Sequence, residues 1–275
     1  LPLEKEQKYD EGFAAAVNIA TAPVGQLIPP TTAFIVFSAA GGGASVAALF
    51  MAGWIPGLLW AACCMVVAFF YARKQGYVIK RDKLTAKIVG KTIWDAIPSL
   101  FLVVIIIGGI LSGKFTPTEA SGVAVAYAFI LSVFIYRTIK LSEIPKLLVD
   151  AAVMTTIVML IIGASSVLSF VMSFTGLPAA ISKLVLGISS NKYVILLILN
   201  IFLLIVGTFM DMAPALLIFT PIFLPIVQSF GMSPIHFGVM MVMNLSVGTI
   251  TPPVGNVLFV GCSVAKLRVE QVMKH

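Results

Sequence analysis

Two long stretches almost free of charge constrain this chain more than any other feature. Residues 12–72 contain no Asp, Glu, Lys or Arg, and residues 193–265 contain one formal charge, Asp211. A membrane-spanning helix needs about 20 apolar residues, so each stretch can hold several passes. Only 11% of the residues are charged, whereas water-soluble domains carry about 25%. The sequence therefore predicts an all-α protein that crosses the membrane several times.

The net charge of +7 is concentrated in two segments, 73–91 and 137–146. Basic residues gather in cytoplasmic loops of membrane proteins, so we expect both segments on the cytoplasmic side. This topology explains the charge better than nucleic-acid binding, and no nucleic-acid partner is expected. The three cysteines, Cys63, Cys64 and Cys262, lie in apolar runs without metal-ligand spacing, and we expect buried thiols.

The pattern of apolar runs divides the chain into four parts. Residues 1–43 are expected to end a first repeat with a broken helix, and residues 44–93 to hold a span and a basic loop. Residues 94–147 read as a helical pair with a capping turn at 116–119. Residues 148–275 are expected to form a second repeat, with a hairpin at 207–227 and a broken helix at 237–265.

Several local features refine this division. Pro214, Pro221 and Pro225 are expected to interrupt the hairpin. Residues 193–206 look short for a full crossing, and residues 177–190 are expected at the membrane interface. His236 follows Ser233 and Pro234, and we expect it to mark the start of a helix rather than a ligand.

The capping turn is legible in Thr116-Pro117-Thr118-Glu119. Thr116 is placed as an N-cap, with Pro117 at the first helical position and Glu119 three residues after the cap. A glutamate inside the membrane can instead mark an ion or proton site. The capping interpretation is favoured here.

An internal repeat separates two matching segments by 223 residues. Val24-Gly25-Gln26-Leu27-Ile28-Pro29-Pro30 matches Val247-Gly248-Thr249-Ile250-Thr251-Pro252-Pro253, and Leu1-Pro2 matches Leu224-Pro225 at the same offset. Two consecutive prolines remove two backbone donors and open a helix. The freed carbonyl groups must then face protein, water or a cation. Paired breaks in two halves indicate a transporter with inverted repeats, although a simple proline kink is the alternative for either copy.

Polar residues surround both breaks. Asp211 is expected to bind a cation or hold a proton, or alternatively to cap the helix that follows it. Uncharged residues near the breaks are expected to orient a polar substrate, although each alone is also typical of contacts between helices. The substrate-binding residues we predict are Thr21, Pro23, Thr31, Asn244, Thr249 and Asn256.

At this point the chain resembles a known family. Segments 12–32, 108–128, 207–227 and 236–260 are similar to the large membrane subunit of tripartite ATP-independent periplasmic (TRAP) transporters. The resemblance implies an inverted-repeat elevator transporter of the bacterial inner membrane, with re-entrant hairpins. It also implies sodium as the driving ion, with two or more ions and no ATP. The implied partners are a periplasmic substrate-binding protein, a small four-helix membrane subunit, the lipid bilayer and an organic-anion substrate such as sialic acid, a C4-dicarboxylate or a keto acid.

The resemblance also implies sodium ligands at the hairpin tips and breaks. In this sequence these are Gly25, Ile28 and Pro30 in the first half, and Gly207, Asp211, Gly248, Thr251 and Pro253 in the second. The family's first hairpin and final helices have no counterpart in these residues, so we expect the chain to be a fragment.

Other functions fit the sequence less well. An ion-coupled anion transporter or a channel without a binding protein remains open, because broken helices occur there too. An intramembrane aspartyl protease needs two membrane carboxylates, and Asp211 supplies one. The segment Gly90-Lys91-Thr92 ends like a phosphate-binding loop, but Thr85 stands where that loop needs glycine. We therefore expect a secondary transporter and not an enzyme.

Overall fold

The computed structural model describes residues 9–41, 43–76, 86–176 and 191–274, together with 180, 183 and 187. Across this part of the chain every regular element is helical and no strand occurs. Five of these helices are long and apolar enough to cross a membrane, or six if one bent pair counts as a single span. The all-α polytopic architecture expected from the sequence is therefore confirmed.

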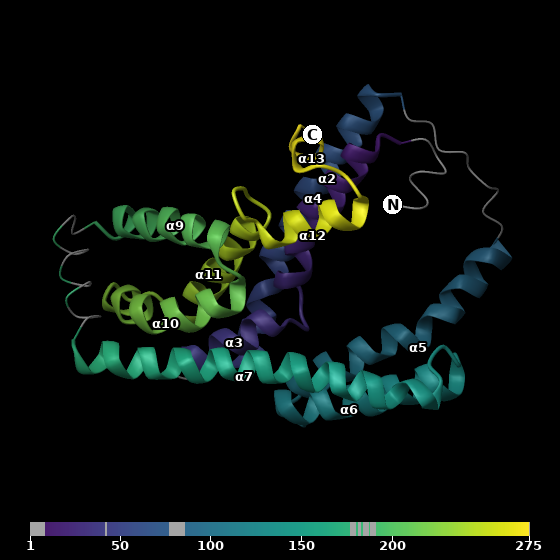
Figure 1. Ribbon diagram of the computed structural model, residues 1–275, viewed down its shortest axis with the longest axis horizontal. Coiled ribbons are helices and arrows are strands. Elements are labelled where there is room, and N and C mark those ends of the chain that lie inside the picture. The colour runs from purple at the N-terminus through teal and green to yellow at the C-terminus, as the bar shows by residue number, and fades with distance from the viewer. Residues whose placement is uncertain are drawn as a thin grey trace. The chain divides into compact units, whose positions relative to one another are not determined.

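The helices fall into two compact units (Figure 1), which are described separately. The first unit comprises Leu1–Ile79 and Ala164–His275, and the second comprises Lys80–Gly163. These units are defined by contacts in space, so the four divisions drawn from the sequence stay predictions. The sequence match at Leu1-Pro2 and most of the segment 177–190 lie outside the described residues.

The second unit is built on α5 (Ala86–Leu111) and α6 (Pro117–Phe129), which pack against each other. A π-helix (Ile130–Ile135) continues α6, and a short 3-10 helix (Leu141–Glu143) precedes α7 (Ile144–Phe174), whose residues from Ala164 onward belong to the first unit. The Tyr127 hydroxyl donates to the carbonyl oxygen of Pro98 at 2.9 Å. This bond ties the two apolar helices together.

The capping box at the start of α6 is confirmed. Glu119 N donates to Thr116 Oγ1 at 3.3 Å, and Thr116 N donates to Glu119 Oε2 at 2.8 Å. Pro117 occupies the first helical position, where its missing N–H leaves no bond unmade. The carboxylate of Glu119 is therefore used in capping, which is the role that the sequence favoured over an ion or proton site.

The first unit contains the first broken helix, α2 (Glu11–Leu27) and α3 (Thr32–Ala40), whose axes differ by 49°. The Asp10 side chain caps α2 and the Thr31 side chain caps α3. The Pro29–Pro30 peptide bond is cis. The helix therefore opens at the paired prolines, as the sequence predicts.

The second broken helix consists of α11 (Pro234–Thr249) and α12 (Asn256–Ala265), and its Pro252–Pro253 bond is also cis. Ser233 caps α11 by accepting from Ile235 N at 3.3 Å. His236 lies in the first turn, as expected for a helix start. Ser233 follows the first helix cap, Asp10, by the same 223 positions that separate the sequence repeats. The repeat is thus preserved in local structure.

The hairpin consists of α9 (Lys192–Phe209) and α10 (Met212–Ser229), and it differs from expectation in two ways. First, α9 has 18 residues and is long enough to be a candidate span. Second, the prolines do not interrupt the helix. Pro221 and Pro225 lie within α10, and Pro214 falls in its first turn, where backbone N–H groups have no helical partner. The break falls instead at Met210-Asp211.

Contacts among the broken helices are reciprocal. The first arm of the first helix, α2, contacts α11 and α12, while the first arm of the second helix, α11, contacts α3. Figure 1 shows α12 lying across α2. Both arms of each broken helix therefore contact the other broken helix.

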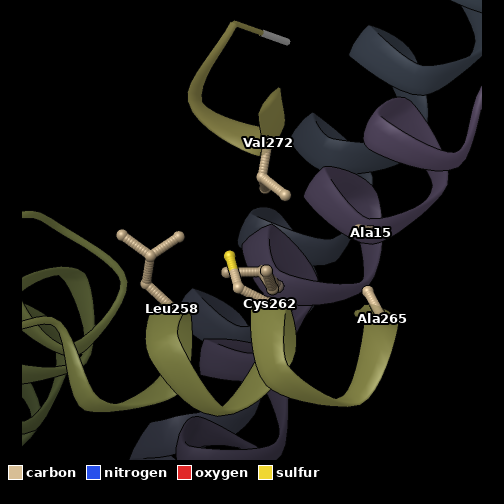
Figure 2. Packing of buried hydrophobic residues seen from close by; sticks show 6 residues of the cluster. Ala15, Leu258, Cys262, Ala265 and Val272 are labelled. Atoms are coloured by element: carbon tan, nitrogen blue, oxygen red, sulfur yellow. The ribbon is translucent and has the colours of Figure 1, made fainter. Parts of the chain in front are cut away.

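Small residues allow α12 to approach α2 closely. Ala15 of α2 faces Cys262 and Ala265 of α12, and Val272 of the short helix α13 (Val269–Met273) covers the same cluster (Figure 2). Leu258 completes the packing. The second arm of one repeat is therefore fixed against the first arm of the other by apolar contact.

The helix α4 (Val46–Lys74) runs beside α2, and it corrects the expectation of buried thiols for two of the three cysteines. Cys262 is buried, but Cys63 of α4 is exposed and Cys64 is only partly buried. A membrane helix keeps apolar residues on its outer face because that face meets lipid. Apolar surroundings in the sequence therefore did not imply burial within the protein.

We expect Thr116→Ala to lower the melting temperature (Tm) of the purified protein by about 1–4 °C, as loss of an N-cap does. Glu119→Gln preserves an acceptor for Thr116 N and should have a smaller effect. Thermal unfolding in detergent measures both. An unchanged Tm for Thr116→Ala would contradict the capping role.

Candidate functional site

The tip of the α9–α10 hairpin meets the second helix break at a glycine contact. A Cβ atom added to Gly248 would lie 2.5 Å from Cα and from the carbonyl carbon of Gly207. A Cβ added to Gly207 would lie 3.1 Å from Gly248 Cα. Both glycines are buried. Two backbones approach this closely only without side chains between them. Two of the residues predicted as sodium ligands, Gly207 and Gly248, are therefore in direct contact.

Backbone hydrogen bonds hold the tip on the break. Val254 N and Gly255 N both donate to the carbonyl oxygen of Thr208, at 3.2 and 3.1 Å. The Thr208 carbonyl oxygen near the end of α9 thus accepts two hydrogen bonds from the non-helical segment between α11 and α12. The hairpin and the break therefore form one structural element.

A side-chain bond joins the starts of the next two helices. Asn256 Nδ2, at the first residue of α12, donates to Asp211 Oδ1 at 3.3 Å. Asp211 occupies the N-cap position of α10, but its side chain makes no capping hydrogen bond. The geometry therefore does not favour the capping interpretation of this carboxylate. Asp211 is exposed in this chain, and one of its oxygens can accept further ligands.

Carbonyl oxygens of the break converge beside Gly255. A Cβ added to Gly255 would lie 2.7 Å from the Thr251 carbonyl oxygen and 3.2 Å from that of Thr249. Gly255 has φ +35°, in the left-handed region that glycine tolerates. A side chain at this position would occupy the space that the two oxygens share.

The side chain of Thr251 adds another oxygen. Its hydroxyl donates to the Val247 carbonyl oxygen at 2.6 Å, which leaves its lone pairs available as acceptors. Among the described residues no group of three or more His, Cys, Asp or Glu side chains could hold a metal ion. A cation bound here would therefore rely on carbonyl and hydroxyl oxygens with Asp211 nearby. Such a set suits a hard ion of low charge rather than zinc or another soft metal.

The first break presents its candidate ligands differently. Gly25 and Pro30 are exposed, and Ile28 N donates to the Val24 carbonyl oxygen at 2.8 Å. The buried Gln26 Oε1 accepts no hydrogen bond from the described part of the chain. A buried side-chain oxygen without a hydrogen-bond partner among the described residues therefore lies within the segment Val24–Pro30, where the sequence predicted the first break.

The predicted substrate residues of α2 and α3 have structural partners. Thr21 Oγ1 donates to the carbonyl oxygen of Val17 at 2.8 Å, within its own helix. Pro23 is buried inside α2, and Thr31 accepts from Ala33 N at 3.2 Å as the cap of α3. Their role in substrate binding stays a prediction.

Asn244 and Thr249 are buried in α11. Asn244 Nδ2 donates to Asn200 Oδ1 of α9, and Thr249 Oγ1 donates to the Ser246 carbonyl oxygen at 2.8 Å. Asn200 in turn donates to the Leu196 carbonyl oxygen at 2.7 Å. Only the bond between Asn244 and Asn200 connects α11 to α9, and the other two lie within single helices. Asn244 therefore lies in an interhelical contact as well as near the break.

The structure thus brings together the second half of the predicted site and adds residues to it. The residues that meet at the hairpin tip and break are Gly207, Asp211, Gly248, Thr251, Pro253 and Asn256. Sequence reasoning missed Thr208, whose backbone carbonyl acts regardless of its side chain, and Asn200. It also missed Gly255, which a glycine two residues after the second proline could have indicated.

Comparison with known sequences decides the family. The profile of the family described as "Tripartite ATP-independent periplasmic transporter, DctM component" matches residues 1–275. The chain belongs to the DctM family.

Relatives of this DctM-family chain include transporter subunits of several bacteria. It is 48% identical over 273 residues to the protein YgiK of Salmonella typhimurium, covering 99% of the chain and 62% of YgiK. It is 40% identical to the C4-dicarboxylate TRAP transporter large permease protein DctM of Pseudomonas aeruginosa, covering 93% of the chain and 60% of that protein. It is 37% identical to the sialic acid TRAP transporter large permease protein SiaM of Vibrio cholerae, with the same two coverages. The chain thus spans about three fifths of each relative.

We expect Gly248→Ala to destabilise the DctM-family chain by about 1–3 kcal/mol, because the added methyl group meets backbone atoms that cannot rotate away. Thermal or denaturant unfolding in detergent measures this change. Gly122→Ala is a matched control, since a Cβ at Gly122 of α6 meets nothing within 4 Å. Equal stability of the two variants would show that the contact between Gly207 and Gly248 is not close.

Proposed function

We propose that this chain carries out sodium-coupled uptake of a small organic anion across the bacterial inner membrane. The observation that supports this most strongly is the convergence of the hairpin tip and the second helix break. There the bare carbonyl oxygens, the Thr251 hydroxyl and the Asp211 carboxylate lie on neighbouring segments. Unwound carbonyls of this kind coordinate sodium in transporters with broken helices.

The cation is proposed to lie among Gly207, Asp211, Gly248, Thr251 and Pro253. The helices α9 and α11 both end here, so the negative ends of two helix dipoles meet at one place. Asp211 supplies a full negative charge in a segment otherwise free of formal charge. A second sodium ion is proposed at the first break, with Gly25, Ile28 and Pro30 contributing.

The anion is proposed to lie near the starts of α10 and α12. Neither helix has a side-chain capping bond at its N-terminus, so first-turn N–H groups remain to bind a carboxylate. Residues 193–265 contain no Lys or Arg, which leaves helix dipoles and amide groups such as that of Asn256 to bind the charge. Thr21, Pro23, Thr31, Asn244 and Thr249 are proposed to complete the substrate site.

The relatives' names indicate which anions to consider. They include C4-dicarboxylate, sialic acid and 2,3-diketo-L-gulonate permease proteins. All of these ligands are organic acids. We propose a substrate of this class, delivered by a periplasmic binding protein and carried together with a small four-helix membrane subunit, without ATP.

The mechanism is proposed to be an elevator movement between inverted repeats. The reciprocal contacts of α2 with α12 and of α11 with α3 support this proposal, because two oppositely oriented copies place their breaks on a shared element. The element would move as a body and carry the bound ions and the anion across the membrane.

Uptake into proteoliposomes tests the proposal. The intact transporter, supplied with its binding protein and small subunit, should accumulate a labelled organic acid when a sodium gradient points inward. A potassium gradient of equal size is the control. Uptake at the same rate with and without a sodium gradient would contradict the proposed sodium coupling. Uptake that needs no binding protein would favour a different ion-coupled carrier or a channel.

Asp211→Asn should weaken the sodium dependence of uptake and leave protein yield nearly unchanged, because the amide preserves shape and removes the charge. The expected result is a higher sodium concentration for half-maximal uptake. Glu119→Gln is a matched control, since it neutralises a membrane carboxylate engaged in capping. A collapse in yield with normal sodium dependence in the surviving protein would assign Asp211 a structural role.

A further inference from the structure

The first helix break lies directly against a stripe of small and hydrogen-bonding residues on α4. Gly53, Gly57, Trp60 and Cys64 follow one another at intervals of four, three and four residues, which places them on one face of a helix. Trp60 Nε1 donates to the Ala20 carbonyl oxygen of α2 at 2.9 Å, so this face is the one that α2 contacts.

Both glycines of the stripe touch the residues where α2 ends. A Cβ added to Gly53 would lie 2.4 Å from the Leu27 carbonyl oxygen and 2.5 Å from Cε2 of Phe34. A Cβ added to Gly57 would lie 2.6 Å from Cγ1 of Ile28. Leu27 is the last residue of α2 and Ile28 is its C-cap. The two glycines therefore face the point at which the helix opens.

Glycine at these positions needs a reason. Within a helix it is less stable than alanine, and α4 is continuous through both positions and through Pro56. Close approach of another backbone supplies the reason, since glycine at a membrane helix interface lets two backbones meet. Here the backbone that approaches is an opened segment rather than a regular helix.

From this contact we infer that Gly53 and Gly57 are positioning residues for the first cation site: they fix where the carbonyl groups of the break point. The inference rests on the proposed sodium binding at Gly25, Ile28 and Pro30. In this inference the first break is held by α4, a helix that lies outside the repeated sequence. The second break is held in a corresponding way by Gly207 of α9.

The two glycines differ in a way that makes the inference testable. Gly53 faces a backbone oxygen, which cannot be removed by substitution. A Cβ at Gly57 would lie 2.6 Å from Cγ1 and 3.4 Å from Cδ1 of Ile28, and 3.3 Å from Cβ of Leu27. Truncating Ile28 removes Cγ1, the closest of these atoms, together with Cδ1, and leaves the carbonyl group of Ile28 in place. Ile28→Ala should therefore make room for the methyl group of Gly57→Ala.

The experiment measures the sodium concentration for half-maximal uptake by the intact, reconstituted transporter, and the sodium-dependent rise in Tm of the purified protein. Gly57→Ala should raise the half-maximal sodium concentration about tenfold, because displaced ligands lose much of their effect. The double variant Gly57→Ala/Ile28→Ala should return toward the wild-type value, whereas adding Ile28→Ala to Gly53→Ala should not restore sodium binding.

Gly261→Ala is the matched control for packing. A Cβ at Gly261 of α12 would lie 2.4 Å from Cγ1 of Ile19, an equally close contact away from either break. It should lower Tm without changing the sodium response. If Gly57→Ala behaves like Gly261→Ala, or if the double variant is not rescued, the positioning role is overturned. If the wild-type protein itself shows no response to sodium in either measurement, the proposed function fails instead.

Discussion

The need to satisfy backbone carbonyl groups inside a membrane is the constraint on which the rest of this structure depends. Lipid offers no hydrogen-bond donors, so an opened helix must place its carbonyls against protein, water or an ion. At the second break, Thr208 and the segment up to Gly255 satisfy one another through two backbone bonds, while the carbonyl groups of Thr249 and Thr251 converge on a shared space. The opened backbone at the second break and the proposed binding of a cation there both result from carbonyl groups that have lost their helical partners.

Glycine contacts make this arrangement sterically feasible. Gly207 against Gly248, and Gly53 and Gly57 against the end of α2, bring a neighbouring helix onto each break. The two breaks share a sequence pattern but are held by different partners, a hairpin in one case and a single long helix in the other. Sequence symmetry therefore does not extend to every contact that surrounds the proposed ion sites.

Much of the fold followed from local rules. The charge-free stretches imply membrane helices, the paired prolines imply breaks, and Thr116 and Glu119 imply a capping box; each depends on residues close together in the chain. The errors arose where local rules lack the deciding information. Pro221 and Pro225 were expected to interrupt α10, but the helix continues through them. The apolar surroundings of Cys63 did not reveal that it lies on an outer face.

By itself, the sequence determined that the chain is an α-helical membrane protein with two matching helix breaks and one carboxylate, Asp211, in its second charge-free stretch. These properties depend on composition and on steric effects between residues close together in the chain, and both can be read from the sequence alone. Only the tertiary structure decided that Asp211 meets Asn256, that Gly207 meets Gly248, and that Asn244 pairs with Asn200. Those pairings join residues about 40 or more positions apart, and packing of whole helices, rather than any local signal, brings them together.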